Sequence, residues 1–401
     1  PTTMSLFAAV EMAPRDPILG LNEQFAADPN PHKVNLGVGV YYDDNGKLPL
    51  LQCVQQAERA MLEHPAARGY LPIDGIAAYD NAVKALVFGA DSEPVRSGRI
   101  ATVQAIGGTG GLKIGADFLR KLKPGAQVLI SDPSWENHRA LFTSAGFDVG
   151  SYAYYDAKRL GIDFEGMLAS LQAASPGSIV LLHACCHNPT GYDLSPEQWD
   201  RVVAVLQARG HTPFLDMAYQ GFGHGIAEDG AVIQKFIQSG LDCFVATSFS
   251  KSFSLYGERV GALSVLCQSK DEAARVLSQL KLVIRTNYSN PPTHGGAIVA
   301  VVLNDPTLRA LWERELAEMR LRIQSMRARL VAGLKAAGVQ RDMGFITQQI
   351  GMFSYSGLSK EQMVRLRSEF GVYGTDTGRM CVAALNSKNI DYVCRSIAAV
   401  L

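Results

Sequence analysis

Cys243-Phe-Val-Ala-Thr-Ser248, a run of apolar and β-branched residues, leads directly into Ser248-Phe-Ser-Lys-Ser-Phe-Ser-Leu-Tyr-Gly-Glu-Arg259. The first run is typical of a strand that is buried on both faces. The second places Lys251 among hydroxyl and aromatic side chains, with Arg259 eight positions later. The stretch therefore predicts a buried strand whose carboxyl end carries reactive groups.

Four further runs of this kind alternate with helical patterns between about residues 112 and 265. They are Gln127–Ser131, Ser178–His183, Thr212–Asp216 and Gly261–Val265. Burial on both faces, with helices between the strands, predicts a mostly parallel central sheet flanked by helices. The fold class is therefore α/β.

The C-terminal part of the chain has a different pattern. A helical pattern from Thr307 to Ala337 would span about 45 Å at 1.5 Å per residue, which is enough to join two domains; two helices separated by a kink are the alternative. Beyond it, the strands Gly351–Tyr355 and Arg379–Ala383 flank a helix over Lys360–Phe370. This compact α+β unit is expected to pack against the N-terminal segment.

These patterns predict two domains, as expected for 401 residues. We expect an N-terminal arm over 1–14, a discontinuous small α+β domain over 15–48 and 320–401, and a large domain over 49–319 that includes most of the long helix.

Composition excludes several classes of partner. The formal net charge is zero, which argues against nucleic acid or an anionic membrane, and no apolar run reaches the roughly 18 residues of a membrane span. The start of the chain shows no secretory signal pattern. The seven cysteines are odd in number and lie mostly in apolar segments. Reduced thiols in a cytoplasmic protein that acts on small molecules fit best.

A metal site is not expected. Cys185-Cys186-His187 offers ligand atoms, but adjacent cysteines cannot easily both bind one ion, and no second C-x-x-C motif lies near.

A glycine-rich stretch offers a place for one phosphate. Gly107-Gly-Thr-Gly-Gly111 precedes an amphipathic run over Leu112–Leu122, and a helix that starts there presents free N–H groups. The dinucleotide fingerprint fails, because Lys113 stands where its third glycine belongs. Partial desolvation would make Lys251 a nucleophilic amine, and Arg259 suits a phosphate. An amine and a phosphate receptor are what pyridoxal phosphate requires, although each motif alone also fits an ordinary turn or a solvated lysine.

Polar side chains follow the predicted strands at their carboxyl ends. Asp216 and Tyr219 suit a pyridine nitrogen and a neighbouring oxygen of such a cofactor, and Asn188 follows another predicted strand at its carboxyl end. Trp135 could stack on an aromatic ring, and His138 could polarise Asp216 from behind. The sequence predicts that these groups meet in one cleft.

Two arginines are candidates for substrate carboxylates. Arg379 precedes an apolar strand of the C-terminal unit, and Arg285 precedes a loop rich in Asn and Pro. Either could bind a carboxylate through two parallel hydrogen bonds. A solvated surface role remains the alternative for each.

Three motifs together resemble one family. His183–Gly191, Phe214–Phe222 and Ser248–Arg259 are similar to those of the class I aminotransferases of PLP fold type I, in the bacterial aspartate/aromatic branch and closest to its aromatic-amino-acid members. The similarity extends from Ala13 to Leu401.

The resemblance implies roles for the cofactor site. Lys251 would form the Schiff base and shuttle the proton, Asp216 would pair with the pyridine nitrogen, and Tyr219 would complete the catalytic set. Asn188 and Tyr219 would hold the 3'-oxygen, and Trp135 would stack on the ring. The phosphate ligands would be Gly108, Thr109, Ser248 and Arg259, with Tyr70 from a second subunit.

It also implies how substrate binds. Arg379 and the Gly39 backbone would hold the α-carboxylate, with Trp135 and Asn188 beside it. Arg285 from the partner subunit would meet a side-chain carboxylate. A homodimer with shared active sites follows from the resemblance, and no metal is implied.

Departures from the family concern substrate choice. Thr375-Asp376-Thr377 lies before Arg379, and we expect Asp376 to face away from it. Tyr42 and Leu48 are expected at the pocket rim, where apolar side chains favour aromatic substrates.

The predicted activity is a ping-pong transamination between aromatic amino acids or aspartate and 2-oxoglutarate. An aspartate-restricted aminotransferase, or a β-lyase, decarboxylase or acyl-condensing synthase of the same fold, is the alternative. A binding module without the cofactor is a further one, which the presence of Lys251 and Asp216 disfavours. The preferred amino donor, the pathway and the degree of domain closure remain open.

Overall fold

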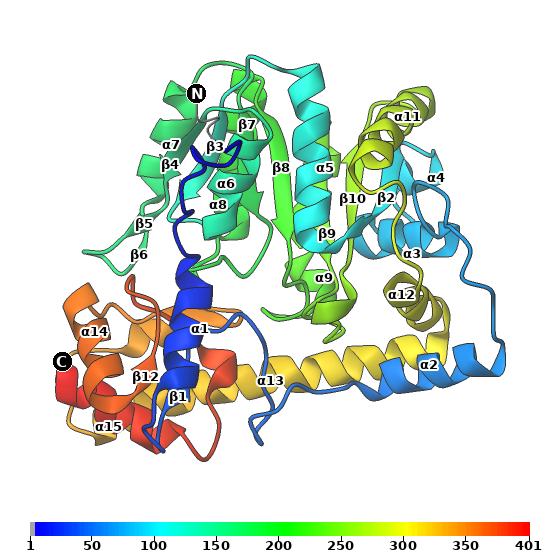
Figure 1. The fold of residues 1–401 in the computed structure, drawn as a ribbon. Helices are drawn as coiled ribbons and strands as arrows, with labels where there is room; N and C mark the ends of the chain where they lie inside the picture. The colour runs from blue at the N-terminus through cyan, green and yellow to red at the C-terminus, as the bar shows by residue number, and fades with distance from the viewer. Residues whose placement is uncertain (1–4) are drawn as a thin grey trace.

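A seven-stranded sheet forms the centre of the computed structural model, which describes residues 5–401 (Figure 1). Its strands, in spatial order, are β2 (Ile100–Ile106), β10 (Val260–Leu266), β9 (Cys243–Ser248), β8 (Thr212–Met217), β7 (Ile179–His183), β3 (Val128–Asp132) and β4 (Val149–Ala153). Neighbours from β9 to β4 pair in parallel, and β10 is antiparallel to both β9 and β2. The predicted mostly parallel α/β sheet is confirmed, while β2 and β4 are strands that the sequence patterns did not indicate.

Alternate residues of each strand point into two separate hydrophobic clusters. Phe214 and Leu263 belong to one cluster, and their chain neighbours Leu215 and Ala262 belong to the other. This follows from the two-residue period of a strand, and it is why the strands are apolar almost throughout.

Helices cover both faces of the sheet. The first cluster is closed by α5 (Gly107–Leu122), α6 (Glu136–Ser144) and α11 (Lys270–Asn287). The second is closed by α3 (Ala77–Phe88), α7 (Phe164–Ala173), α8 (Pro196–Arg209), α10 (Ala231–Ser239) and α12 (His294–Asn304). The short elements are α4 (Glu93–Arg96), α9 (Ile226–Asp229), β5 (Tyr155–Asp156) and β6 (Gly161–Ile162).

One long helix runs beneath the sheet domain, α13 (Pro306–Ala336), with 31 residues (Figure 1). Asp305 caps it by accepting hydrogen bonds from the N–H groups of Thr307 and Leu308, and Pro306 occupies its first turn. Its contacts run from α2 (Gln52–Glu63) and α12 to α15 (Ile390–Val400). The alternative of two helices is therefore wrong.

The C-terminal unit has the predicted elements. The strands β11 (Phe353–Tyr355) and β13 (Arg379–Cys381) are antiparallel, and α14 (Lys360–Phe370) has the predicted limits. Ser359 and Gln362 form a capping box at the start of α14, and Gly371 ends it in a left-handed conformation.

The N-terminal segment packs against this unit, as predicted. After α1 (Pro17–Ala27), β1 (Val34–Asn35) pairs in parallel with β12 (Val372–Tyr373). The guanidinium of Arg322 then donates to the hydroxyl of Tyr41 at 2.7 Å and to the carbonyls of Ala383 and Leu385 at 2.8 Å each. Segments from both ends of the chain are thus tied to α13.

The N-terminal arm has no helix or strand over residues 5–14, and its first four residues lie outside the described part. Within residues 5–401, no helix combines the length and the apolar character that crossing a membrane requires.

Candidate active site

A cavity of about 300 Å³ lies where the carboxyl ends of β7, β8 and β9 face the C-terminal unit. Parallel strands bring their carboxyl ends to one edge of a sheet, which is why residues distant in sequence meet there. The cavity is lined by these sequence-predicted residues: Gly39, Gly108, Thr109, Trp135, Asn188, Asp216, Tyr219, Ser248, Lys251, Arg259 and Arg379.

Lys251 is placed by the turn that follows β9, and its amine lies 5.0 Å from the ring centre of Tyr219. Burial lowers the pKa of this lysine to about 8, with Asp216 opposing the shift and Arg259 adding to it. At neutral pH a larger fraction of the amine is therefore neutral than in a solvated lysine.

Asp216 lies in β8 and is held from behind by His138 of α6. The Nε2 atom of His138 lies 2.7 Å from Oδ2 of the carboxylate. Burial alone would raise the pKa of Asp216, but the hydrogen bond and charge of His138 hold it below its usual range. The geometry agrees with the pair that the sequence predicted. The contact with His138 leaves Asp216 ionised.

His138 belongs to a longer buried chain of polar groups. Its Nδ1 atom lies 2.8 Å from the hydroxyl of Ser134, which lies 3.2 Å from Nε2 of His183. Burial lowers the pKa of His183 to about 3, so this ring is neutral. The neutral ring of His183 thus orients His138 through Ser134 and places no charge of its own near Asp216.

Asn188 is carried by a turn that a buried carboxylate closes. Asp193 accepts hydrogen bonds from the backbone N–H groups of Cys186 at 2.7 Å and His187 at 2.9 Å. The side-chain oxygen of Asn188 then accepts a hydrogen bond from Nη1 of Arg379 at 3.2 Å. The turn thus links β7 to the C-terminal unit across the cavity.

The glycine-rich stretch is not a loop before a helix, as the sequence suggested, but the first turn of α5 itself. Glycine has low helix propensity, which hid this start. Gly107 has φ +68°, and a Cβ atom there would lie 2.3 Å from Nη2 of Arg259, so only glycine leaves room for the guanidinium. No side chain of residues 5–401 caps the helix, and its free N–H groups face the same cavity as Ser248 and Arg259.

Arg379 is buried in the wall of the C-terminal unit. Its Nη2 atom donates to the carbonyl of Gly37 at 3.3 Å, and its guanidinium carbon lies 4.4 Å from the ring centre of Phe353. Its Nε atom is buried and has no partner within residues 5–401. Asp376 instead pairs with Arg367 at 2.6 Å, so the expectation that it faces away is confirmed.

Two predicted residues stand apart from the cavity. Tyr70 is 93% exposed in the segment before α3, and Arg285 is exposed on α11, where it donates to the hydroxyl of Ser289 at 2.6 Å. A single chain does not bring either of them to Lys251.

The expected rim residues also lie elsewhere. Neither Tyr42 nor Leu48 lines the cavity. Tyr42 faces a second cavity beside Asn386 and Tyr392, because its backbone is drawn toward α13 by Arg322.

Some lining residues were missed from the sequence. They are Ile18, Leu112, Glu136, His183, Cys185, Ala218, Ser250 and Phe353. Phe353 alone had a usable signal, because alternate residues of the predicted strand 351–355 must share a face. Ile18 sits in the first turn of α1 and carries no mark that distinguishes it from a core residue.

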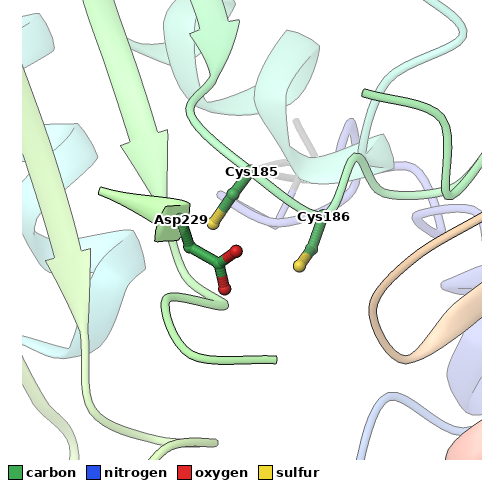
Figure 2. Close-up of side chains that lie close together, drawn as sticks. All are labelled: Cys185, Cys186 and Asp229. Atoms are coloured by element: carbon green, nitrogen blue, oxygen red, sulfur yellow. The ribbon is translucent and has the colours of Figure 1, made fainter. Parts of the chain in front are cut away.

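Cys185, which lines the cavity, comes together with Cys186 and Asp229, and the ligand atoms of the three lie within 4.8 Å of one another (Figure 2). Both carboxylate oxygens of Asp229 already accept backbone N–H groups, from Gly221 at 2.8 Å and His224 at 2.9 Å among others. Three N–H donors, two of them in buried hydrogen bonds, would lose their partner if a cation took these oxygens. The geometry therefore favours a structural role for Asp229. All seven cysteines are unpaired and buried.

The donor set fits the cofactor that the sequence predicts. A helix N-terminus, two serine hydroxyls and a guanidinium offer donors to a phosphate. The guanidinium of Arg259 occupies the space beside Gly107 that a side chain would fill. The carboxylate of Asp216 and the amine of Lys251, whose pKa is lowered, line the same cavity.

Comparisons with known proteins agree with this site. Residues 31–397 match the family described as aminotransferase class I and II. The chain is 62% identical to the aspartate aminotransferase of Pseudomonas aeruginosa, over 99% of this chain and 100% of that one. It is 50% identical to the aromatic-amino-acid aminotransferase of Escherichia coli, over the same shares of the two chains. The crystal structure of an aromatic-amino-acid aminotransferase from Burkholderia pseudomallei, covalently bound to pyridoxal phosphate, superposes with a TM-score of 0.98 at 65% identity, covering 99% of this chain and 100% of that one.

Proposed function

The chain belongs to the class I and II aminotransferases, and we propose that the cavity around Lys251 is where it moves an amino group between an amino acid and a 2-oxo acid. The protein is a pyridoxal phosphate-dependent aminotransferase of the aspartate/aromatic branch. The observation that carries the assignment of the site is the convergence in one cavity of an amine, a carboxylate, a phosphate receptor and a guanidinium whose Nε atom has no partner among residues 5–401.

When bound, pyridoxal phosphate supplies an aldehyde for the lysine amine and a pyridine ring that accepts electron density from the substrate. Asp216 would pair with the ring nitrogen, and Asn188 and Tyr219 with the 3'-oxygen. Trp135 would stack on the ring. The phosphate would be held by Gly108, Thr109, Ser248 and Arg259.

Lys251 would carry out the proton transfer. Its neutral amine can take the proton from the substrate Cα atom, and the pKa of about 8 keeps part of the amine neutral at physiological pH. Asp216, ionised and fixed by His138, lies close enough to raise the pKa of that amine. The pair therefore sets the pKa at which the lysine accepts and returns the proton.

Arg379 would hold the α-carboxylate of the substrate, with the Gly39 backbone, Trp135 and Asn188 beside it. Its buried Nε atom has no partner in the described part of the chain, and Phe353 covers one face of its guanidinium. A carboxylate in the cavity would satisfy this donor, because a guanidinium binds carboxylates through two parallel hydrogen bonds.

We also propose that the enzyme is a homodimer with shared active sites. Tyr70 and Arg285 are exposed and lie outside the cavity of their own chain. They would serve the neighbouring site, where Tyr70 of the partner subunit would bind the phosphate and Arg285 of the partner subunit would bind a side-chain carboxylate. A small domain over 15–48 and 320–401 would close the site from below. Unpaired cysteines support a cytoplasmic location.

A panel of amino donors tests this function. Tyrosine, phenylalanine and aspartate, each with 2-oxoglutarate as acceptor, should all yield glutamate, and their kcat/KM values rank the donors. Turnover of aspartate alone would indicate the aspartate-restricted alternative. Release of ammonia or carbon dioxide without glutamate would overturn transamination in favour of a β-lyase or a decarboxylase.

A further inference from the structure

A buried glutamine in β2 joins two surface segments that are far apart in the sequence. Gln104 is 2% exposed, and its backbone N–H donates to the carbonyl of Asp74 at 3.0 Å. Its side-chain oxygen accepts the N–H of Ile76 at 3.0 Å, and its side-chain nitrogen donates to the carbonyl of Pro292 at 3.1 Å. One side chain therefore fixes both the turn over 72–76 and the end of the loop over 288–292.

Two glycines make room for this side chain. Gly75 has φ +92°, and a Cβ atom there would lie 2.3 Å from Cβ of Gln104. A Cβ atom at Gly296, in the first turn of α12, would lie 2.3 Å from the side-chain nitrogen. The packing leaves the amide group one position, so both of its hydrogen bonds are fixed in direction.

The first of the two segments leads to Tyr70. The N–H of Gly75 donates to the carbonyl of Pro72 at 2.9 Å, which closes the turn just after Tyr70. No helix or strand supports the chain between residues 64 and 72. The position of the turn therefore decides where the exposed phenol stands.

The second segment leads to Arg285. This residue lies in the last turn of α11, and its Nη1 atom donates to the hydroxyl of Ser289 in the loop that Pro292 ends. Lys281 of the same helix lies 3.9 Å from Asp74, but the pair is partly exposed and long, so it adds little. The buried amide is the stronger of these two links.

We infer that Gln104 is a positioning residue that holds Tyr70 and Arg285 as one unit and presents them to the active site of the partner subunit. The inference rests on the proposed sharing of the two sites. It assigns to a residue that touches neither substrate nor cofactor an effect that appears in the neighbouring subunit. A merely structural role would instead affect the site of the subunit that carries the substitution, or both sites equally.

Two variants remove the link in different ways. Gln104→Met keeps the length of the side chain and loses both of its hydrogen bonds. Gly296→Ala displaces the amide by its new methyl group, and its higher helix propensity offsets part of the cost of that overpacking. Thr102→Val is the matched control, because Thr102 is also buried in β2 and its hydroxyl bonds, among residues 5–401, only to Ser264, at 2.8 Å.

The test uses holoenzyme heterodimers with one live site, purified by two different tags. Lys251→Ala inactivates the site of the subunit that carries it. In the first heterodimer, Gln104→Met stands on the Lys251→Ala subunit, so the live wild-type site receives Tyr70 and Arg285 from the altered subunit. In the second, Gln104→Met stands on the live subunit. Gly296→Ala and Thr102→Val are placed in the same two ways.

The half-reaction with each amino donor is followed by absorbance. In the first heterodimer we expect the half-saturating concentration of aspartate to rise about tenfold and that of phenylalanine, which lacks the second carboxylate, to rise less. The second heterodimer and both Thr102→Val heterodimers should match the parent. In Gln104→Met homodimers the cofactor should dissociate faster, because Tyr70 no longer holds its place.

Other outcomes overturn the inference. A tenfold rise in the second heterodimer but not in the first would make the effect local to its own subunit. Equal values in both heterodimers, for Gln104→Met and Gly296→Ala alike, would show that the link is not used. A monomeric active enzyme by light scattering would overturn the shared site itself, and this inference with it, which separates the two failures.

Discussion

The carboxylate of Asp216 and the imidazole of His138 are joined at 2.7 Å, at a place where the imidazole is fully buried. The carboxylate comes from the end of a central strand and the imidazole from α6 on one face of the sheet. The pair stays ionised at Asp216 because His138 offsets the cost of burial. The contribution of the Asp216–His138 pair to the stability of the fold can be measured separately from its contribution to catalysis.

Replacing His138 with Leu should leave a buried carboxylate without its donor. We expect a loss of about 3–5 kcal/mol in the free energy of unfolding of the cofactor-free chain, and partial recovery, by about 1–4 kcal/mol, when Asp216→Leu is added. Urea unfolding of the two single variants and the double variant measures this. His64→Leu, at an exposed histidine, is the control. A double variant less stable than either single variant would contradict the interpretation.

The nucleophilicity of Lys251 should depend on pH with a midpoint near 8 rather than the 10.4 or so of a solvated lysine. Acylation of the cofactor-free chain by a small anhydride, read at Lys251 by mass spectrometry, gives this midpoint. Asp216→Asn should move it lower and Arg259→Gln higher, because the carboxylate raises the pKa and the guanidinium lowers it. Identical midpoints in all three proteins would disprove these couplings.

The lowered pKa of Lys251 also makes the stability of the folded chain depend on pH. Between pH 8 and about 10.5 the folded chain binds fewer protons at Lys251 than the unfolded chain does, so the penalty for burying the amine falls as pH rises. The stability gained by Lys251→Met should therefore be larger at pH 7 than at pH 10.

Phe353 should matter through Arg379. Loss of the ring that lies 4.4 Å from the guanidinium removes an interaction of about 1–2 kcal/mol, so Phe353→Leu should raise KM about 5- to 30-fold for every amino donor, with a smaller change in kcat. Phe353→Tyr, which keeps the ring, should retain the parent KM. Arg379→Lys should impair all donors more severely, since a point charge cannot replace the fork. A KM effect of Phe353→Leu confined to aromatic donors would indicate a contact with the substrate side chain instead.

Arg322 should hold the two ends of the chain together. Arg322→Met leaves the carbonyls of Ala383 and Leu385 without a donor, and we expect a loss of about 3 kcal/mol in unfolding free energy. Arg322→Lys should recover part of it. Arg329 lies on the same helix as Arg322 and makes one exposed bond to Ser387, so Arg329→Met is the control. Hydrogen exchange of the β1–β12 amides should accelerate in Arg322→Met alone.

The central sheet could be predicted because a strand buried on both faces leaves an apolar run that no surface element has. The direction in which a strand runs leaves no such pattern in its sequence. Nothing in Gly261–Val265 therefore distinguished the antiparallel strand β10 from the parallel strands of the sheet. The edge strand β4 is half-exposed and lacks the apolar run. The start of α5 was missed because packing against Arg259 outweighs the poor helix propensity of its glycines.

The same difference separates the site residues that the sequence predicted from those that it did not. Lys251, Asp216 and Asn188 were found because strand order places their ends together. Phe353 lies in β11, which Arg327 of α13 holds by hydrogen bonds to the carbonyl of Phe353 and the hydroxyl of Ser354, and no local pattern encodes this contact. Ile18 lies in α1, and no local pattern encodes how α1 lies against the cavity either. Tyr42 was misplaced for the same reason, since hydrogen bonds from Arg322 to the 41–42 backbone and side chains decide where that segment lies.

Because every cysteine is buried, thiol-directed labels should react very little with the folded protein. A single cysteine introduced by Val364→Cys, at a 41% exposed position on α14, would then be the one readily labelled position on each chain. Spin labels attached there would report the distance between the two copies of α14 in solution. Because the native thiols are buried, labels on one introduced cysteine can thus be used to measure how two copies of the chain assemble.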